Sequence, residues 1–153
     1  MSPRTLFRAV ALAEAATWTL LLLGLFLKYV THTTETGVSI GGGLHGFVFL
    51  CYVASTCFIW VNQKWSAGTG LLALASAVVP YATVPVEKML DRRGLLNGGW
   101  RLADGGEAPR GPLELAQAWV LRHPVPALAV VLAGVAAVFG FLLFLGPPDT
   151  WLT

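Results

Sequence analysis

Residues 125–145, VPALAVVLAGVAAVFGFLLFL, form an apolar run without a single charged side chain. The hydrocarbon core of a bilayer is crossed by a helix of about 20 apolar residues, and this run has that length. Three further apolar runs precede it, at residues 5–28, 38–61 and 66–86. The sequence therefore predicts an all-α fold, an integral membrane bundle of four transmembrane helices.

The composition agrees with a membrane protein. Hydrophobic residues make up 56% of the 153 residues and charged residues only 12%, whereas a soluble domain carries about a quarter charged residues. The net charge of +2 is small and no basic cluster alternates with aromatic residues, so nucleic-acid binding has no support. Cys51 and Cys57 do not have a metal-ligand spacing, and no metal or other cofactor is expected.

The order of the runs predicts three parts. Residues 1–94 would form a three-helix membrane domain, and residues 95–124 a polar loop in which 112–122 could be a short interfacial helix. Residues 125–153 would form the fourth transmembrane helix and a short tail.

The distribution of basic residues gives an expected orientation. In a four-span bundle the loops 29–37 and 87–123 share one membrane face, which then holds seven of the ten Lys and Arg residues. Cytoplasmic loops are enriched in Lys and Arg. We therefore expect these two loops in the cytoplasm and both termini outside.

Several short words in the first three runs resemble those of a known family. In chain order they are Phe7-Arg8, Glu14, Leu27-Lys28-Tyr29, His45-Gly46, Tyr52, Lys64-Trp65-Ser66, Pro80 and Asp91-Arg92. This order and spacing over residues 4–94 resembles the DUF3817 family of bacterial integral membrane proteins, which is marked by a His-Gly motif. The resemblance implies a multi-pass protein of the cell membrane with no assigned activity. It gives no guidance on residues 95–153.

Glu14 is the most informative single residue, because it lies about ten residues into the first run. A carboxylate at mid-bilayer costs about 2.5–3.5 kcal/mol on insertion scales. Glu14 could bind a proton or a cation, or it could be a protonated carboxyl that hydrogen-bonds between helices for packing.

Counting residues predicts which groups surround Glu14. It lies about 21 Å from the Lys28 face and His45 about 10 Å from it, so a direct contact between the two is not expected. Tyr52 and Ser55 of the second run, and Ser76 of the third, are expected at its level, with Pro80 freeing the carbonyl of residue 76. Glu14, Tyr52, Ser55, Ser76 and Pro80 are therefore the candidate intramembrane polar site.

A second candidate site lies at a membrane face. If successive spans alternate in direction, the first ends, the second begins and the third ends on the same face. The residues expected there are Lys28, Tyr29, His45, Gly46, Asp91 and Arg92.

Three functions remain open. The first is an accessory or assembly subunit that binds another membrane protein, or a second copy of itself, through its helices within the bilayer. The second is a small proton-coupled transporter that uses Glu14 and His45. The third is a lipid-binding or lipid-modifying module that uses the basic loop. No catalytic motif occurs, so nothing in the sequence points to an enzyme.

Overall fold

A computed structural model describes residues 1–145, and every regular element among them is a helix. The helices are α1 (Pro3–Tyr29), α2 (Thr36–Gln63), α3 (Ala67–Ser76), α4 (Thr83–Arg92), α5 (Pro112–Arg122) and α6 (Pro124–Leu145). The predicted all-α class is confirmed. Three of the helices, α1, α2 and α6, are long and apolar enough to cross a membrane. The tail predicted after residue 145 lies outside the described residues.

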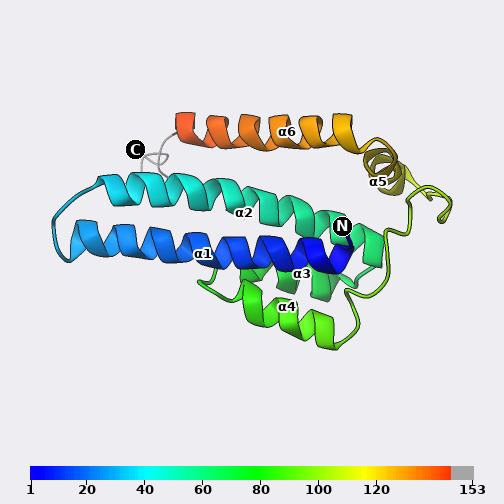
Figure 1. The fold of residues 1–153 in the computed structure, drawn as a ribbon, viewed down its shortest axis with the longest axis horizontal. Coiled ribbons are helices and arrows are strands. Elements are labelled where there is room, and N and C mark those ends of the chain that lie inside the picture. The colour runs from blue at the N-terminus through cyan, green and yellow to red at the C-terminus, as the bar shows by residue number, and fades with distance from the viewer. Residues whose placement is uncertain (146–153) are drawn as a thin grey trace.

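The long helices α1 and α2 lie side by side and antiparallel (Figure 1). Ser2 caps α1 by accepting a hydrogen bond from the Thr5 amide, and Pro3 occupies the first turn, where no amide hydrogen is required. Lys64 ends α2 in a left-handed conformation with φ 50°. Glycines bring the two backbones into contact: a Cβ atom on Gly24 would meet Gly37 at 2.5 Å, and one on Gly41 would meet the Leu20 carbonyl oxygen at 2.8 Å. Packing of small residues thus joins the two helices.

The third predicted span, residues 66–86, is not one helix. It is divided into α3 and α4 by turns at residues 77–82, and the chain reverses direction there. The C-terminal end of α4 lies at the N-terminal end of α1, because Arg4 and Asp91 form an ion pair at 2.6 Å. The start of α3 is at the same end, since Trp65 donates to the Leu95 carbonyl at 2.8 Å. Both ends of this α3–α4 hairpin therefore lie at one end of the bundle (Figure 1).

Two prolines explain why the predicted span is divided. Pro80 has no amide hydrogen and its ring clashes with the carbonyl of residue 76, which ends α3. Pro85 falls in the first turn of α4, where it removes no helical hydrogen bond. Between them, Tyr81 adopts φ 65°, a left-handed conformation that is unusual for a bulky residue and turns the chain back. Pro80 was expected to free the carbonyl of residue 76 within a continuous third span, and instead it ends a helix.

The hairpin moves the basic loop to the opposite end of the molecule. Lys28 pairs with Glu35 at the α1–α2 connection, whereas Lys64 pairs with Glu107 at the other end. The expectation that loops 29–37 and 87–123 share one face is therefore wrong. Of the ten Lys and Arg residues, all except Lys28 lie at the end that holds the start of α1.

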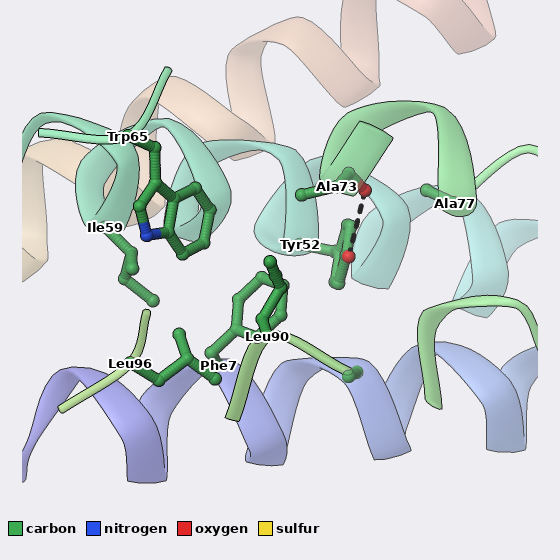
Figure 2. Packing of buried hydrophobic residues seen from close by; sticks show 9 residues of the cluster. Phe7, Tyr52, Ile59, Trp65, Ala73, Ala77, Leu90 and Leu96 are labelled. Carbon is green, nitrogen blue, oxygen red and sulfur yellow. Dashed lines mark hydrogen bonds between the residues drawn. The ribbon is translucent and has the colours of Figure 1, made fainter. Parts of the chain in front are cut away.

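The apolar core lies at that same end (Figure 2). The Phe7 ring contacts the Tyr52 ring at 5.6 Å between centroids and the Trp65 ring edge-on at 5.8 Å. Leu90 of α4 and Leu96 beyond it are fully buried against these rings. This cluster stabilises the return of the hairpin along α1.

The segment after α4 is attached to the end of α2 by Arg101. Its guanidinium, only 13% exposed, donates to the Val61 and Asn62 carbonyls at 3.2 and 3.1 Å, so it caps the C-terminus of α2. It also pairs with Glu114 at 2.7 Å and Glu107 at 3.0 Å. Hydrogen bonds from Arg101 hold the pKa of Glu114 below its usual value, and bonds from Lys64 and then Arg101 do the same for Glu107.

Helices α5 and α6 complete the described chain. Residues 112–122, which were considered for an interfacial helix, form a helix with those bounds, and its Gln117 donates to the Phe58 carbonyl at 2.8 Å. Helix α6 runs along the outer side of α2 (Figure 1), where Phe139 meets Gly46 and Phe47. Its contacts within the described chain are with α2 and α5 alone.

Labelling of single cysteines tests the chain reversal. In a variant without Cys51 and Cys57, we expect Thr36→Cys and Asp104→Cys to react with a membrane-impermeant maleimide from opposite sides of the membrane. Both positions are exposed. A continuous third span would place both on the same side, so labelling from one side would contradict the reversed hairpin.

Alanine substitutions test the glycine contact. Gly41→Ala should lower thermal stability in detergent, because its methyl group would meet the Leu20 backbone. Gly43→Ala is the matched control, since a Cβ atom there meets nothing within 4 Å, and alanine favours a helix over glycine by about 1 kcal/mol. Equal melting temperatures for the two variants would contradict this account of the α1–α2 packing.

Candidate functional site

Glu14 is fully buried in α1 and faces the beginning of α4. The Thr83 hydroxyl oxygen lies 3.1 Å from Glu14 Oε2 and also 3.1 Å from the Ala11 carbonyl oxygen. A threonine hydroxyl has one hydrogen to donate. When that hydrogen goes to Ala11, a favourable contact with Oε2 requires a protonated carboxyl that donates to Thr83. A neutral Glu14 therefore satisfies both contacts at once.

The second carboxyl oxygen of Glu14, Oε1, is buried and has no hydrogen-bond partner within residues 1–145. A buried polar atom left without a partner costs about 1–3 kcal/mol, and more if it is charged. The same residues contain no group of three His, Cys, Asp or Glu side chains that could hold a metal ion. Chemically, the site is suited to holding a proton on a carboxyl group.

His45 lies beside Thr17, the next polar residue of α1 on this side. Thr17 Oγ1 donates to the Glu14 carbonyl at 2.9 Å and lies 3.2 Å from His45 Nδ1. Because the single hydroxyl hydrogen is used, Nδ1 must be the donor to Thr17. The Trp18 ring packs against the imidazole at 4.4 Å. His45 thus carries a hydrogen on Nδ1 and is joined to the Glu14 backbone through Thr17.

This arrangement corrects the predicted depth of His45. The count from Lys28 separates Glu14 and His45 by about 11 Å. In the structure the Gly24–Gly37 contact sets the register, and Glu14 precedes Gly24 by ten residues while His45 follows Gly37 by eight. The two residues therefore differ by about 3 Å in depth. The error arises because Lys28 lies a full turn beyond the point where the helices meet.

Tyr52 and Ser76, both predicted for the polar site, are in contact. Tyr52 donates to the Ala73 carbonyl at 3.0 Å, shown as a dashed line in Figure 2, and its hydroxyl lies 3.1 Å from Ser76 Oγ. Trp18 donates to the Ala77 carbonyl at 3.3 Å. Side-chain donors of α1 and α2 therefore bind the carbonyls at the C-terminal end of α3. This satisfies backbone groups that a membrane interior cannot hydrate.

The structure separates the remaining predicted residues of this site. Ser55 faces a groove between α2 and α6 and does not join Glu14. Pro80 lies in the turn of the hairpin. Thr83 was missed, because nothing in the spacing of an apolar run shows that the chain reverses and brings this residue to α1.

The predicted membrane-face cluster does not form. Lys28 and Tyr29 lie at the α1–α2 connection, and Asp91 pairs with Arg4 at the opposite end of the bundle. His45 is internal beside Thr17, and Gly46 contacts Phe139 of α6. Arg92 follows Asp91 and makes no ion pair within the described chain. The cluster required a third helix that crosses the membrane, and the hairpin returns instead.

A double-mutant cycle tests the Glu14–Thr83 contact. Thr83→Val should destabilise the protein by about 1–3 kcal/mol, because it leaves the buried Glu14 carboxyl without any partner. Adding Glu14→Leu should recover most of that loss, since both polar partners are then replaced by apolar groups. Glu14→Gln alone should retain the fold, because an amide can still donate to Thr83.

Unfolding in mixed micelles would measure these free energies, with Thr19→Val as the control for an exposed threonine that bonds to Tyr81. The proposed contact would be contradicted if the loss of unfolding free energy in the Thr83→Val, Glu14→Leu double mutant equalled the sum of the losses in its two single mutants.

Comparison with known proteins agrees with the membrane fold. A family profile described as "Domain of unknown function (DUF3817)" matches residues 4–92. A curated protein of Streptomyces coelicolor named as a membrane protein, SCO5905, is 44% identical over 91 residues, which are 59% of this chain but 11% of that protein. The matched part is therefore about a tenth of the relative's length. No solved structure matches the chain.

The family profile ends at Arg92, the last residue of α4, so α5 and α6 lie beyond the matched residues. It contains α1, α2 and the α3–α4 hairpin, and with them Glu14, His45, Tyr52 and Thr83. The resemblance noted from the His-Gly motif is confirmed, and because the profile covers more than half of its length, this chain belongs to the DUF3817 family.

Proposed function

We propose that this protein is an accessory subunit that binds a larger membrane protein within the bilayer. The observation that carries the proposal is the Streptomyces relative, in which the matching 91 residues are 11% of a longer chain named as a membrane protein. In that relative, the residues that match this chain belong to a much larger membrane polypeptide, which supports packing of this bundle against further membrane helices.

The outer side of α6 is the surface proposed to bind the partner. Ala127 and Val135 are buried on the side toward α2. Four small residues occur at steps of three or four along α6, and all are exposed: Ala129, Ala133, Ala137 and Gly140. Successive helical residues are about 100° apart, so Ala133 and Val135 lie on nearly opposite sides. Small residues at such steps allow a second membrane helix to approach closely.

The interior of the bundle supports a transporter less well. Glu14, Tyr52, Thr56 and Thr83 are fully inaccessible, and His45 is 9% exposed. The groove beside α2 is lined mainly by apolar side chains. A transporter needs a polar path that reaches both faces, and these residues are enclosed by the hairpin.

The distribution of cations supports a specific orientation. Nine of the ten Lys and Arg residues lie at the end where α1 starts, and only Lys28 lies at the other. By the positive-inside rule, we propose that the start of α1 and the segment 93–123 are cytoplasmic. Relative to the expectation from four spans, the start of α1 and the loop 29–37 exchange sides, whereas the segment after α4 stays cytoplasmic.

Co-purification tests the partner. The tagged full chain, extracted from its native membrane with a mild detergent, should retain one larger membrane protein in a fixed ratio. Ala133→Leu and Gly140→Leu should abolish this retention, because the added side chains obstruct the outer side of α6. Ala16→Leu, at an exposed alanine of α1, is the matched control and should retain the partner. A partner that remains bound to both α6 variants would overturn this surface, and a chain that purifies alone would overturn the function.

A further inference from the structure

A groove of about 570 Å³ runs between α2, α5 and α6 and belongs to neither of the sites described above. Phe58, Trp100 and Leu121 line its end near the cytoplasmic loops, and Cys51, Val131 and Val135 line its deep end. The Trp100 indole nitrogen already donates to the Met1 carbonyl at 2.6 Å. The walls therefore offer an apolar molecule a large contact surface and offer a polar one very few partners.

The length of the groove matches one leaflet. Its lining on α6 extends from Pro124 to Val135, which is twelve residues or eleven helical steps. At 1.5 Å per residue this is about 16 Å, and half of a hydrocarbon core of about 30 Å is about 15 Å. The groove thus begins where α6 enters the membrane and ends near the mid-plane, as a single lipid chain does.

Charge at the open end favours an anionic headgroup. Arg122 follows the lining residue Leu121, and its only ion-pair partner in the described chain is Asp104 at 3.5 Å, whose side chain is 85% exposed. Basic residues at a membrane surface attract anionic lipids by about 1 kcal/mol each.

We propose that this groove is a binding site for one anionic phospholipid of the leaflet at the start of α1. One acyl chain lies along the groove between α2 and α6, and the phosphate is held at Arg122. The site does not depend on the partner proposed for the outer side of α6, because the two surfaces lie on different sides of that helix.

Native mass spectrometry of the purified full chain tests this site. The probes are palmitoyl-oleoyl phosphatidylglycerol, which is anionic, and the matching phosphatidylcholine, which is zwitterionic. We expect one phosphatidylglycerol per chain to remain bound after the detergent is removed. Ala54→Trp, which fills the groove from α2, should reduce this retention by at least about tenfold. Ala16→Trp, at an exposed alanine of α1 that does not line the groove, should leave it unchanged.

A second pair of measurements separates headgroup recognition from chain binding. Arg122→Gln should reduce the preference for phosphatidylglycerol over phosphatidylcholine by about fivefold. Because Ala54→Trp could prevent folding, Val131→Trp fills the groove from the α6 wall, and circular dichroism checks each variant. Equal retention in the groove and control variants would overturn the site, and equal binding of the two lipids would overturn its anionic specificity. Loss of a co-purifying membrane protein from Ala54→Trp, with lipid retention unchanged, would identify a protein helix as the occupant instead.

Discussion

The arrangement of this protein depends on one constraint, that a backbone carbonyl or amide inside a membrane must have a hydrogen-bond partner. Pro80 breaks the helix in the third apolar run and leaves carbonyls without their usual donors. The chain can reverse at that depth only because other helices supply donors. Tyr52 binds the Ala73 carbonyl and Trp18 binds the Ala77 carbonyl. Without these side chains a break at this position would be unfavourable in lipid.

The reversal then determines the electrostatics of the whole molecule. Because α4 returns to the start of α1, Asp91 meets Arg4 and the basic segment 93–123 joins the end of α2. Nine cations are thereby collected at one end, and Arg101 uses two carboxylates and two backbone carbonyls to attach the segment to α2. The same reversal encloses Glu14, since Thr83 is the first residue of the returning helix.

The molecule therefore separates a closed interior from a lipid-facing exterior with two distinct surfaces. The interior holds Glu14, Thr17 and His45 in one hydrogen-bonded chain that is out of contact with either membrane face. The exterior offers small side chains on one side of α6 and an apolar groove on the other. Both surfaces are consistent with the proposed accessory subunit that holds a lipid beside its partner. In this proposal the enclosed polar groups serve to pack the helices together.

The sequence by itself determined the class of the protein and the limits of its long helices. Charge-free and nearly charge-free runs of about 20 residues lead to membrane helices because hydrocarbon cannot hydrate a free backbone. The start of α6 could be predicted for this reason, and Tyr52 and Ser76 were both expected in one polar layer. The short words from Phe7-Arg8 to Asp91-Arg92 were sufficient to identify the family.

The tertiary structure alone decided which residues meet. Hydropathy measures the length of an apolar run but not its direction, so the reversal at Pro80 and the placement of Thr83 against Glu14 could not be read from residues 66–86. Proline is compatible with either a kink or a break, and the donors that allow a break come from Tyr52 and Trp18 on other helices. The depth of His45 likewise depended on where the backbones of α1 and α2 touch, at Gly24 and Gly37. Counting residues along one helix cannot give the register between α1 and α2, because that register is set where their backbones touch.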